Sequence, residues 1–356
     1  MSEKPKRELV KGNVAIARAA IEAGCRFYFG YPITPQNDIP EYMAKYLPLV
    51  GGTFLQAESE IASINMCLGV SATGGRAMTS SSGPGISLKQ EGLSYMASSQ
   101  LPVVVVNIMR SGPGLGGISP SQGDYFQATR GGGHGDYRVI VLAPNSGQEM
   151  WDLTFLAFHL ADKYRNPAQI LADAVLGQTS EAIELRKPQL GSLPPKDYIV
   201  SGAKNRQKRV IKSLFLGEGE NEAHNWELYE KYKRIEANEV RWEEYLTEDA
   251  ELVVVAFGIA SRISRSAVDR AREKGIKVGL FRPITLWPFP IKQLNELSKR
   301  VHKLLSVELN TGQMIEDIRI AVGDQAQIFF YGRPPGAGSL PYPEDVLKQI
   351  EKYAGD

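Results

Sequence analysis

Three side chains in the first third of the sequence could bind an acidic ligand or move a proton: Thr34, Glu60 and Arg110. A threonine hydroxyl can donate to a carboxylate, and an arginine guanidinium presents a planar fork of donors that matches one. A glutamate can act as a general acid or base when it is shielded and well placed. Taken by type alone, Thr34 and Arg110 could therefore hold a carboxylate and Glu60 could move a proton.

The surroundings of Thr34 predict where it lies. A strand-like run at 25–29 precedes it, a glycine and a proline follow that run, and Thr34-Pro35 suits the N-cap and first residue of a helix. We expect the helix to reach about Leu47, with a kink at Pro40. Thr34 would then stand at the carboxyl end of a strand, where open α/β sheets bind ligands. Taken alone, these residues also fit a helix start without a ligand.

Glu60 and Arg110 also stand at the ends of expected elements. Glu60 falls in the first turn of a helix, where its charge suits the helix dipole even without a function. Arg110 ends the apolar run 101–109, which is typical of a central parallel strand buried on both faces, although a surface arginine at a strand end is the alternative. The apolar stripe of the helix is expected at Ala57, Ile61, Ile64 and Leu68.

Two glycine-rich segments predict close approach of a ligand. Ser82-Gly83-Pro84-Gly85 follows a strand-like run and leads into a helix expected to end near Ser98, although this is also a common turn composition. The stretch 111–138 predicts a binding loop, a lid or disorder. It is not a Walker phosphate loop, because no Lys-Ser or Lys-Thr follows its glycines.

Length and patterning predict the domain organisation. Residues 8–185 alternate strand and helix, which predicts an α/β domain whose parallel sheet has helices on both faces. Residues 186–247 are charged and carry the basic run 204–209, while the alternation restarts at 248. A chain of 356 residues is long for one core. We therefore expect domains at 1–185 and 248–356 joined by a connector at 186–247.

Composition excludes several classes of partner and site. The net charge of +1 gives no reason to expect nucleic acid or an anionic membrane. The two cysteines cannot form a disulfide framework, a structural zinc site or a four-thiolate iron–sulfur cluster. No run approaches the roughly 20 apolar residues of a membrane span, and the N-terminus lacks an apolar signal region. We expect a cytoplasmic protein without a metal site of its own.

The segment Gly30-Tyr31-Pro32-Ile33-Thr34-Pro35 resembles the signature of the 2-oxoacid:ferredoxin oxidoreductases, which use thiamine diphosphate. The resemblance implies that Thr34 binds the carboxylate of a 2-oxoacid. It also implies that Tyr31 contacts the substrate and Pro32 the cofactor. Arg110 falls where this family places a substrate-binding arginine.

The segment from Glu60 to Gly69 resembles the pyrimidine-binding domain of thiamine diphosphate enzymes. There a glutamate bonds the N1′ atom of the cofactor and favours the imino tautomer, whose amine takes the proton from the thiazolium C2. Glu60 matches by its spacing to the glycine, whereas Glu58 does not. The turn at 82–85 looks like the Thr-Ser-Gly-Pro-Gly segment of enzymes such as acetolactate synthase, which implies cofactor contacts. These contacts fall on Ser82, Gly83 and Gly85.

The segment 282–290 resembles the carboxyl-terminal domain shared by transketolase, the pyruvate dehydrogenase β subunit and the α chains of the oxidoreductases. The implied fold is a thiamine diphosphate-binding fold followed by a transketolase C-terminal-like α/β domain. The implied protein is an α subunit for coenzyme A-dependent oxidative decarboxylation, with electrons passed to ferredoxin. No Gly-Asp-Gly followed by a suitably spaced asparagine is present. The resemblance therefore implies a β subunit that carries the diphosphate and Mg²⁺ site and an iron–sulfur cluster, with γ and ferredoxin-like δ subunits.

The substrate is indicated by the loop 114–120, which looks like that of branched-chain (2-oxoisovalerate) α subunits. Leu115 and Ile118 would suit an aliphatic tail better than a second carboxylate, or they pack the loop. An enzyme that acts on 2-oxoglutarate is the second interpretation. A non-catalytic assembly subunit of the same fold and a self-sufficient thiamine decarboxylase or transketolase are the remaining alternatives.

Overall fold

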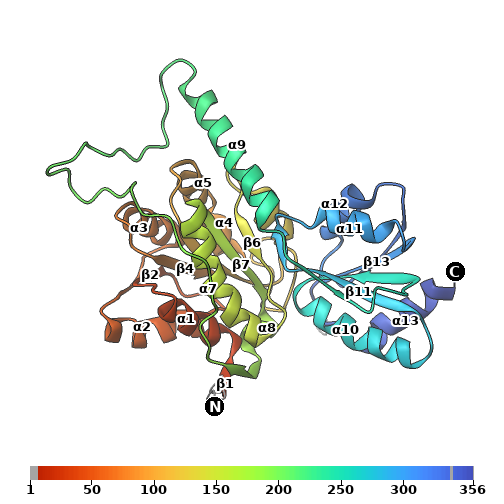
Figure 1. The fold of residues 1–356 in the computed structure, drawn as a ribbon. Helices are drawn as coiled ribbons and strands as arrows, with labels where there is room; N and C mark the ends of the chain where they lie inside the picture. Colours follow the sequence, from red (N-terminus) through yellow and green to blue (C-terminus); the bar gives the residue numbers. More distant parts are fainter. Residues whose placement is uncertain (1–6, 337–339, 356) are drawn as a thin grey trace, which may run out of the picture.

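The computed structural model describes residues 7–336 and 340–355. A seven-stranded sheet in the order β12-β6-β7-β5-β4-β2-β3 forms the larger lobe, and all of its pairings are parallel except that of β12 with β6 (Figure 1). Its strands are β2 (Phe27–Gly30), β3 (Thr53–Gln56), β4 (Ala77–Ser81), β5 (Val103–Met109), β6 (Ile140–Leu142), β7 (Pro167–Asp173) and β12 (Thr285–Trp287).

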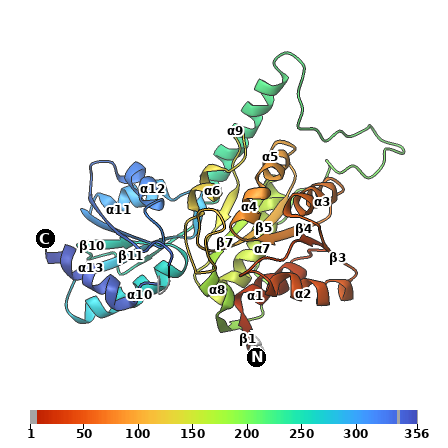
Figure 2. The same ribbon diagram turned by 180° about the vertical axis from the view of Figure 1, so that it is seen from behind.

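Helices cover both faces of this sheet, as the alternation predicts (Figures 1 and 2). Central strand β5 is buried along its whole length, with Val103 and Val105 in one apolar cluster and Val104 and Val106 in the other. Helices α1 and α7 contact each other on one face, and α3 and α5 contact each other on the other. The helices of this lobe are α1 (Gly12–Glu22), α2 (Asp38–Tyr46), the 3-10 turn η1 (Pro48–Val50), α3 (Glu60–Ala72), α4 (Pro84–Leu88), α5 (Gln90–Ser98), α6 (Tyr125–Arg130), α7 (Gly147–Tyr164) and α8 (Ala174–Gln178).

A five-stranded sheet in the order β14-β13-β10-β11-β9 forms the second lobe, with β9 antiparallel to its neighbour. Its strands are β9 (Trp242–Tyr245), β10 (Leu252–Val255), β11 (Val278–Pro283), β13 (Lys303–Glu308) and β14 (Gln327–Gly332). Helices α10 and α13 lie on one side of it and α11 and α12 on the other (Figure 1). Their bounds are α10 (Gly258–Glu273), α11 (Ile291–Ser298), α12 (Met314–Val322) and α13 (Pro343–Gly355).

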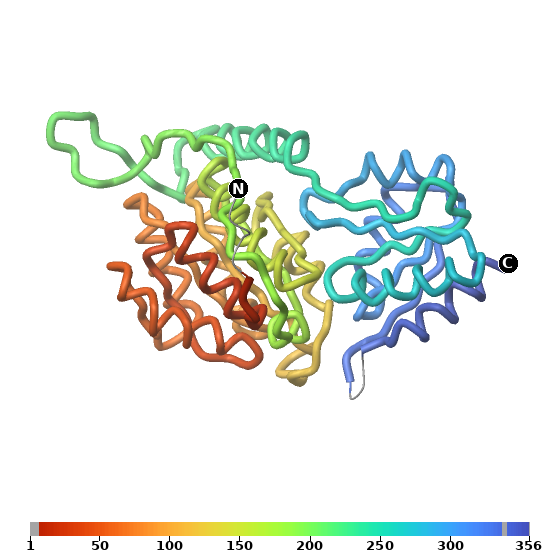
Figure 3. The backbone as a smooth tube through the Cα atoms, turned by 60° about the horizontal axis from the view of Figure 1, so that its bottom comes forward, coloured from red at the N-terminus to blue at the C-terminus, as the bar shows by residue number. Residues whose placement is uncertain are grey.

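Between the lobes, the chain leaves the body as an arm. Strand β8 (Ser180–Glu184) pairs with β1 (Arg7–Lys11) in a separate two-stranded sheet. Residues 186–219 have no regular element; Tyr198 and Ile199 of this stretch pack against the large lobe, and α9 (Glu220–Asn238) then returns along that lobe (Figures 1 and 3).

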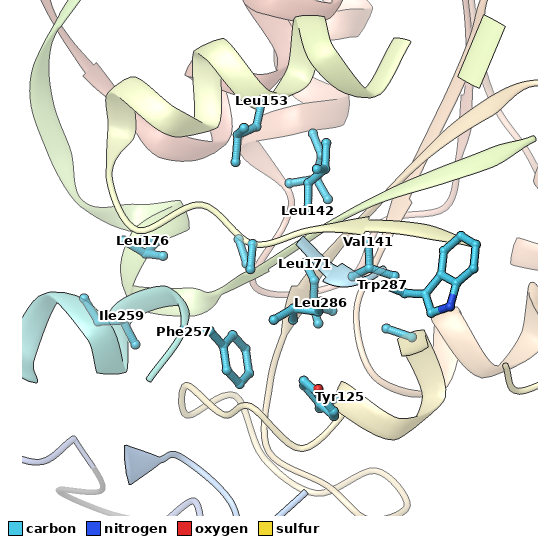
Figure 4. Close-up of a cluster of buried hydrophobic side chains, with 14 of the residues drawn as sticks. Tyr125, Val141, Leu142, Leu153, Leu171, Leu176, Phe257, Ile259, Leu286 and Trp287 are labelled. Carbon is cyan, nitrogen blue, oxygen red and sulfur yellow. The ribbon is translucent and has the colours of Figure 1, made fainter. Parts of the chain in front are cut away.

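The two lobes share a packed junction. Strand β12 belongs to the carboxyl-terminal part of the sequence but pairs with β6 of the large sheet, and β9 belongs to the expected connector but pairs with β11. Figure 4 shows Leu286 and Trp287 beside Val141 and Leu171, with Phe257 and Ile259 of the second lobe close by. The buried Arg282 joins the lobes by hydrogen bonds to Glu149 and Glu243. The division at 185 and 247 remains a prediction. Strands β9 and β12 each pair with a strand on the other side of at least one of these boundaries.

The expected start of the helix after Thr34 is wrong. The Thr34-Pro35 bond is cis and does not start a helix; α2 begins at Asp38, because side chains of Asn13 and Gln178 take the Pro35 carbonyl that an earlier helix would use. Pro40 therefore lies in the first turn, where its missing N–H needs no partner and no kink results.

The expected apolar stripe of α3 is wrong at one position: Ala57 and Ile64 are buried and Leu68 packs against the core, but Ile61 faces outward. Ile61 is 47% exposed, and the buried residues of the helix are mostly polar or small. They are Glu60, Ser63, Ile64, Cys67 and Ser71. Within the residues described, no helix is both long and apolar enough to cross a bilayer.

Candidate functional site

The carboxyl ends of β5, β4 and β2 meet at one edge of the large sheet, because these neighbouring strands run parallel. Thr34 follows β2, the 82–85 turn follows β4, and Arg110 follows β5. Glu60 opens α3, the helix that follows β3. The topology therefore places all three candidate side chains at the edge where doubly wound sheets bind ligands.

Arg110 lies directly against Thr34. Its Nη1 donates to the Thr34 carbonyl at 3.1 Å, and its Nη2 donates to the Leu115 carbonyl at 3.3 Å. Its Nε is buried without a partner. The guanidinium passes over Gly83, where φ is +49° and an added Cβ would lie 3.1 Å from Nε. The absence of a side chain at Gly83 therefore leaves room for the Arg110 guanidinium.

Side chains from α1 and α8 hold the loop that carries Thr34. Asn13 and Gln178 both donate to the Pro35 carbonyl at 2.9 Å, and both also donate to Asp38. Burial acts to raise the pKa of Asp38, but hydrogen bonds from Lys11, Asn13 and Gln178 outweigh it and the pKa is lowered. An ionised Asp38 thus completes a network that holds the loop carrying Thr34.

Of the five predicted substrate residues, Thr34 and Ile118 line one pocket beside this loop. The pocket has a volume of about 390 Å³ and is lined also by Asp38 and Gln178. Leu115 and Ile118 are 80% and 65% exposed, so neither packs a core within this chain. Tyr31 is 40% exposed on the same loop. Pro32 lies apart from them, in a separate pocket lined also by Phe54.

Glu60 is buried, with 6% of its surface exposed. It is the first residue of α3 after the Ser59 cap, whose side chain accepts from the Ala62 N–H. Its Oε1 accepts from the Ser81 hydroxyl at a long 3.4 Å. An added Cβ at Gly85 would lie 2.4 Å from the same oxygen. The carboxyl group therefore sits in a cradle that only glycine leaves open, with hydrogen-bonding capacity to spare.

Two residues that the sequence analysis does not single out join this site. Asn107 on β5 donates to Asp124 at 2.9 Å, while its own Oδ1 is buried without a partner. Burial raises the pKa of Asp124, opposed by Asn107 and by the charge of Arg110. The signal available in the sequence was a lone asparagine inside an otherwise apolar strand. Ser82 Oγ is likewise buried without a partner.

Unpartnered buried polar atoms at one sheet edge are the mark of a binding site, because such atoms are costly unless a ligand satisfies them. Here they are Ser82 Oγ, Asn107 Oδ1 and Arg110 Nε. With the shielded Glu60 carboxyl and the glycine cradle beside it, the site fits the aminopyrimidine of thiamine diphosphate. Across the described ranges, no group of three or more histidine, cysteine, aspartate or glutamate side chains could hold a metal ion.

Comparison with known families agrees with this site. Residues 18–246 match the family described as pyruvate flavodoxin/ferredoxin oxidoreductase, thiamine diphosphate-binding, and residues 250–346 match the pyruvate:ferredoxin oxidoreductase core domain II. Ketoisovalerate oxidoreductase subunit VorB of Methanothermobacter thermautotrophicus is 53% identical over 98% of this chain and 98% of its own. The 2-oxoglutarate synthase subunit KorA of the same organism is 37% identical over 96% of this chain and 98% of its own.

Solved structures agree on the fold. The 2-oxoglutarate:ferredoxin oxidoreductase from Magnetococcus marinus, solved with 2-oxoglutarate, coenzyme A and succinyl-CoA bound, has a TM-score of 0.91 at 28% identity. The match covers 99% of this chain and 66% of the other. A split-gene transketolase has a TM-score of 0.61 at 12% identity, which is a likeness of fold alone.

These matches confirm the expected thiamine diphosphate-binding fold with a transketolase-like architecture. The first family match alone takes in more than half of the chain, and a relative over half identical spans nearly all of it. This protein therefore belongs to the pyruvate flavodoxin/ferredoxin oxidoreductase family, the 2-oxoacid oxidoreductases that its sequence resembles.

Proposed function

We propose that this chain is the α subunit of a 2-oxoacid:ferredoxin oxidoreductase that acts on a branched-chain acid such as 2-oxoisovalerate. The overall reaction would be oxidative decarboxylation to an acyl-CoA and carbon dioxide, with the electrons passed to ferredoxin. One observation carries the choice of substrate: the relative at 53% identity is named a ketoisovalerate oxidoreductase subunit, against 37% for the 2-oxoglutarate synthase subunit. 2-Oxoglutarate is the second candidate.

In this proposal, Thr34 and Arg110 hold the substrate carboxylate. The two residues are in contact, and the free Nε of Arg110 gives the guanidinium a donor for the incoming acid. Tyr31, on the same loop, borders the substrate. Exposed Leu115 and Ile118 would cover its aliphatic tail and gain burial when it binds.

Glu60 would share a proton with the N1′ atom of the cofactor pyrimidine. Its burial meets the need for a shielded acid, since a weak base would not keep the proton in open water. Gly83, Gly85 and Ser82 would let the ring approach closely, with Pro32 at the edge of the loop. Bound there, thiamine diphosphate would supply the carbon that attacks the keto group and accepts the electrons released on decarboxylation.

The rest of the active site would come from partner subunits. The relatives are named as subunits, and this sequence lacks both the diphosphate motif and a set of cluster cysteines. We assign the diphosphate and Mg²⁺ site and an iron–sulfur cluster to a β subunit, with γ and ferredoxin-like δ subunits completing the complex. Coenzyme A and ferredoxin would be its co-substrates in the cytoplasm.

The test is co-expression of the chain with its partner subunits and assay of coenzyme A-dependent reduction of ferredoxin. We expect the highest kcat/KM with 2-oxoisovalerate and lower values with 2-oxoglutarate and pyruvate. A preference for 2-oxoglutarate would move the assignment to the second candidate. Absence of turnover with all three acids in a complex that binds thiamine diphosphate would contradict the proposal.

A further inference from the structure

A buried lysine lies beneath the candidate acid. Lys89 occupies the break between α4 and α5 and has none of its surface exposed. Its Nζ donates to the backbone carbonyl of Glu60 at 3.4 Å and to the hydroxyl of Ser63. Ser63 Oγ in turn donates to the Glu60 carbonyl at 2.8 Å. The lysine thus holds the first turn of α3, which presents the Glu60 carboxyl group.

This is an unfavourable place for an ammonium group. A helix N-terminus carries partial positive charge and repels a cation, and a dry interior penalises any charge without a close counter-ion. Among the ion pairs of the described residues, none includes Lys89. A methionine of similar length would fill the same space without these costs. The lysine therefore calls for a role other than packing.

The titratable groups that face Lys89 are Glu60 and Cys67, both on α3. Burial lowers the pKa of Lys89 to about 8, and the charge of Glu60 acts against that fall. Burial raises the pKa of the Cys67 thiol to about 12, so Cys67 is neutral at physiological pH. Glu60 is the acidic group beside Lys89, and its charge favours the protonated amine. The other residues packed against its carboxyl group, Ser81 and Gly85, do not titrate in this range.

We propose that Lys89 is a positioning residue for Glu60: it fixes the turn that carries the acid and supplies a positive charge that favours the ionised carboxyl group. An ionised Glu60 leaves the shared proton on the cofactor nitrogen and not on the acid, which is the state its proposed role needs. A nearby positive charge favours the ionised form of a carboxyl group. This inference rests on the proposed function of Glu60.

The test uses the assembled complex with K89M, which removes the charge but keeps the length, and K89R, which keeps the charge. K231M is the matched control, because Lys231 on α9 is also buried, with its pKa lowered to about 7 mainly by burial, and donates only to the Arg165 carbonyl among its described contacts. Two quantities are measured from pH 5.5 to 9. One is the dissociation constant of thiamine diphosphate by calorimetry, and the other is the rate of deuterium exchange at C2 of the bound cofactor.

We expect the acid limb of the C2-exchange profile to move up by about one pH unit in K89M, which is about a tenfold loss of rate on that limb. Cofactor binding should weaken over the same range. K89R should recover most of the shift, and K231M should match wild type. A K89M profile that superimposes on wild type, or a K231M shift as large as that of K89M, would overturn the inference.

Two further variants separate the possible failures. If E60Q leaves C2 exchange unchanged, the proposed role of Glu60 fails; if E60Q abolishes exchange while K89M does not shift it, the Lys89 inference alone fails. Should K89M not assemble, S63A removes the hydroxyl that accepts from Lys89 and should give a smaller shift in the same direction. Its control is S71A on the same helix, where the lost bond is to the Pro102 carbonyl.

Discussion

The guanidinium of Arg110 donates a hydrogen bond to the backbone carbonyl of Thr34 at 3.1 Å, although the two residues are 76 positions apart in the sequence. Each stands at the carboxyl end of its own strand, and β4 lies between those strands. The contact forms because the turn after β4 bears a glycine that lets the arginine side chain cross it. The sheet topology thus brings these two candidate carboxylate-binding residues into contact.

This contact predicts a loss of substrate binding in R110A. A hydrogen bond to a charged group contributes roughly 1.5–3 kcal/mol, so kcat/KM for the 2-oxoacid should fall by about 10- to 150-fold, mainly through KM. R110K should recover only part of the loss, because a lysine lacks the planar fork. R270A, at an exposed arginine paired with Glu344, should leave steady-state rates unchanged. Equal KM values for R110A and wild type would remove Arg110 from the substrate site.

The exposed loop residues predict a change in substrate preference. In L115A and I118A, removal of apolar surface should lower kcat/KM for 2-oxoisovalerate by about tenfold while pyruvate, which lacks the branched tail, is affected less. Rates on the two acids with each variant give the ratio directly. A control at the equally apolar and exposed Leu216 on the arm, L216A, should leave the ratio as in wild type. An unchanged ratio in both loop variants would make them packing residues of the loop.

The junction between the lobes predicts a large loss of stability in R282M. Arg282 is 3% exposed and donates two hydrogen bonds to Glu149 and one to Glu243, and each glutamate is partly exposed. Breaking such a buried pair costs about 3 kcal/mol, at the low end because the glutamates can regain water. The urea midpoint should fall accordingly, whereas R265A at the exposed end of the same network should shift it little. A small shift in R282M would show that apolar packing alone joins the lobes.

Asp173 predicts a pH dependence of stability. Burial raises its pKa from 3.8 to about 6, opposed by hydrogen bonds from the Leu176 and Val175 N–H groups. The native state therefore binds more protons than the unfolded state between about pH 4 and 6. The contribution of Asp173 to the free energy of unfolding therefore falls as pH rises through that window, by at most about 3 kcal/mol.

The check is the urea midpoint from pH 4 to 7 in wild type and D173N, since asparagine keeps the acceptor for both N–H groups. The variant should lose this downward slope. D249N gives the opposite comparison, because a hydrogen bond from Arg272 lowers the pKa of the exposed Asp249. Parallel curves for wild type and D173N would show that Asp173 does not hold a proton in this range.

The sequence predicts the alternating architecture because it depends on local signals, and it predicts the three site residues through short motifs that resemble the family. An apolar run ending in a polar residue, as at 101–110, marks a buried parallel strand whose working end is exposed. The start of α2 could not be predicted in this way. Side chains from Asn13 and Gln178 decide the path of Thr34-Pro35, and Gln178 is 143 positions away from Pro35.

Contacts between residues far apart in the sequence also explain why local patterns do not predict the lobe junction or the burial of Lys89. In the sequence, Thr285–Trp287 looks like part of a stiff, proline-rich turn. In the structure it is strand β12 and pairs with a strand more than 140 positions earlier, which no local pattern indicates. Lys89 has the sequence surroundings of an ordinary helix lysine, yet it is fully buried and donates hydrogen bonds to Glu60 and Ser63 of α3. The roles of the predicted site residues stay predictions until they are measured.

The central claim is tested most directly by 2-oxoacid-dependent ferredoxin reduction in the reconstituted complex with E60Q, beside E58Q at the exposed glutamate two positions earlier. A buried acid that shares a proton with the cofactor cannot be replaced by an amide, so the account predicts at least about a 100-fold loss of kcat in E60Q. E58Q should be as active as wild type. Equal rates for E60Q and wild type, with thiamine diphosphate bound in both, would contradict the account.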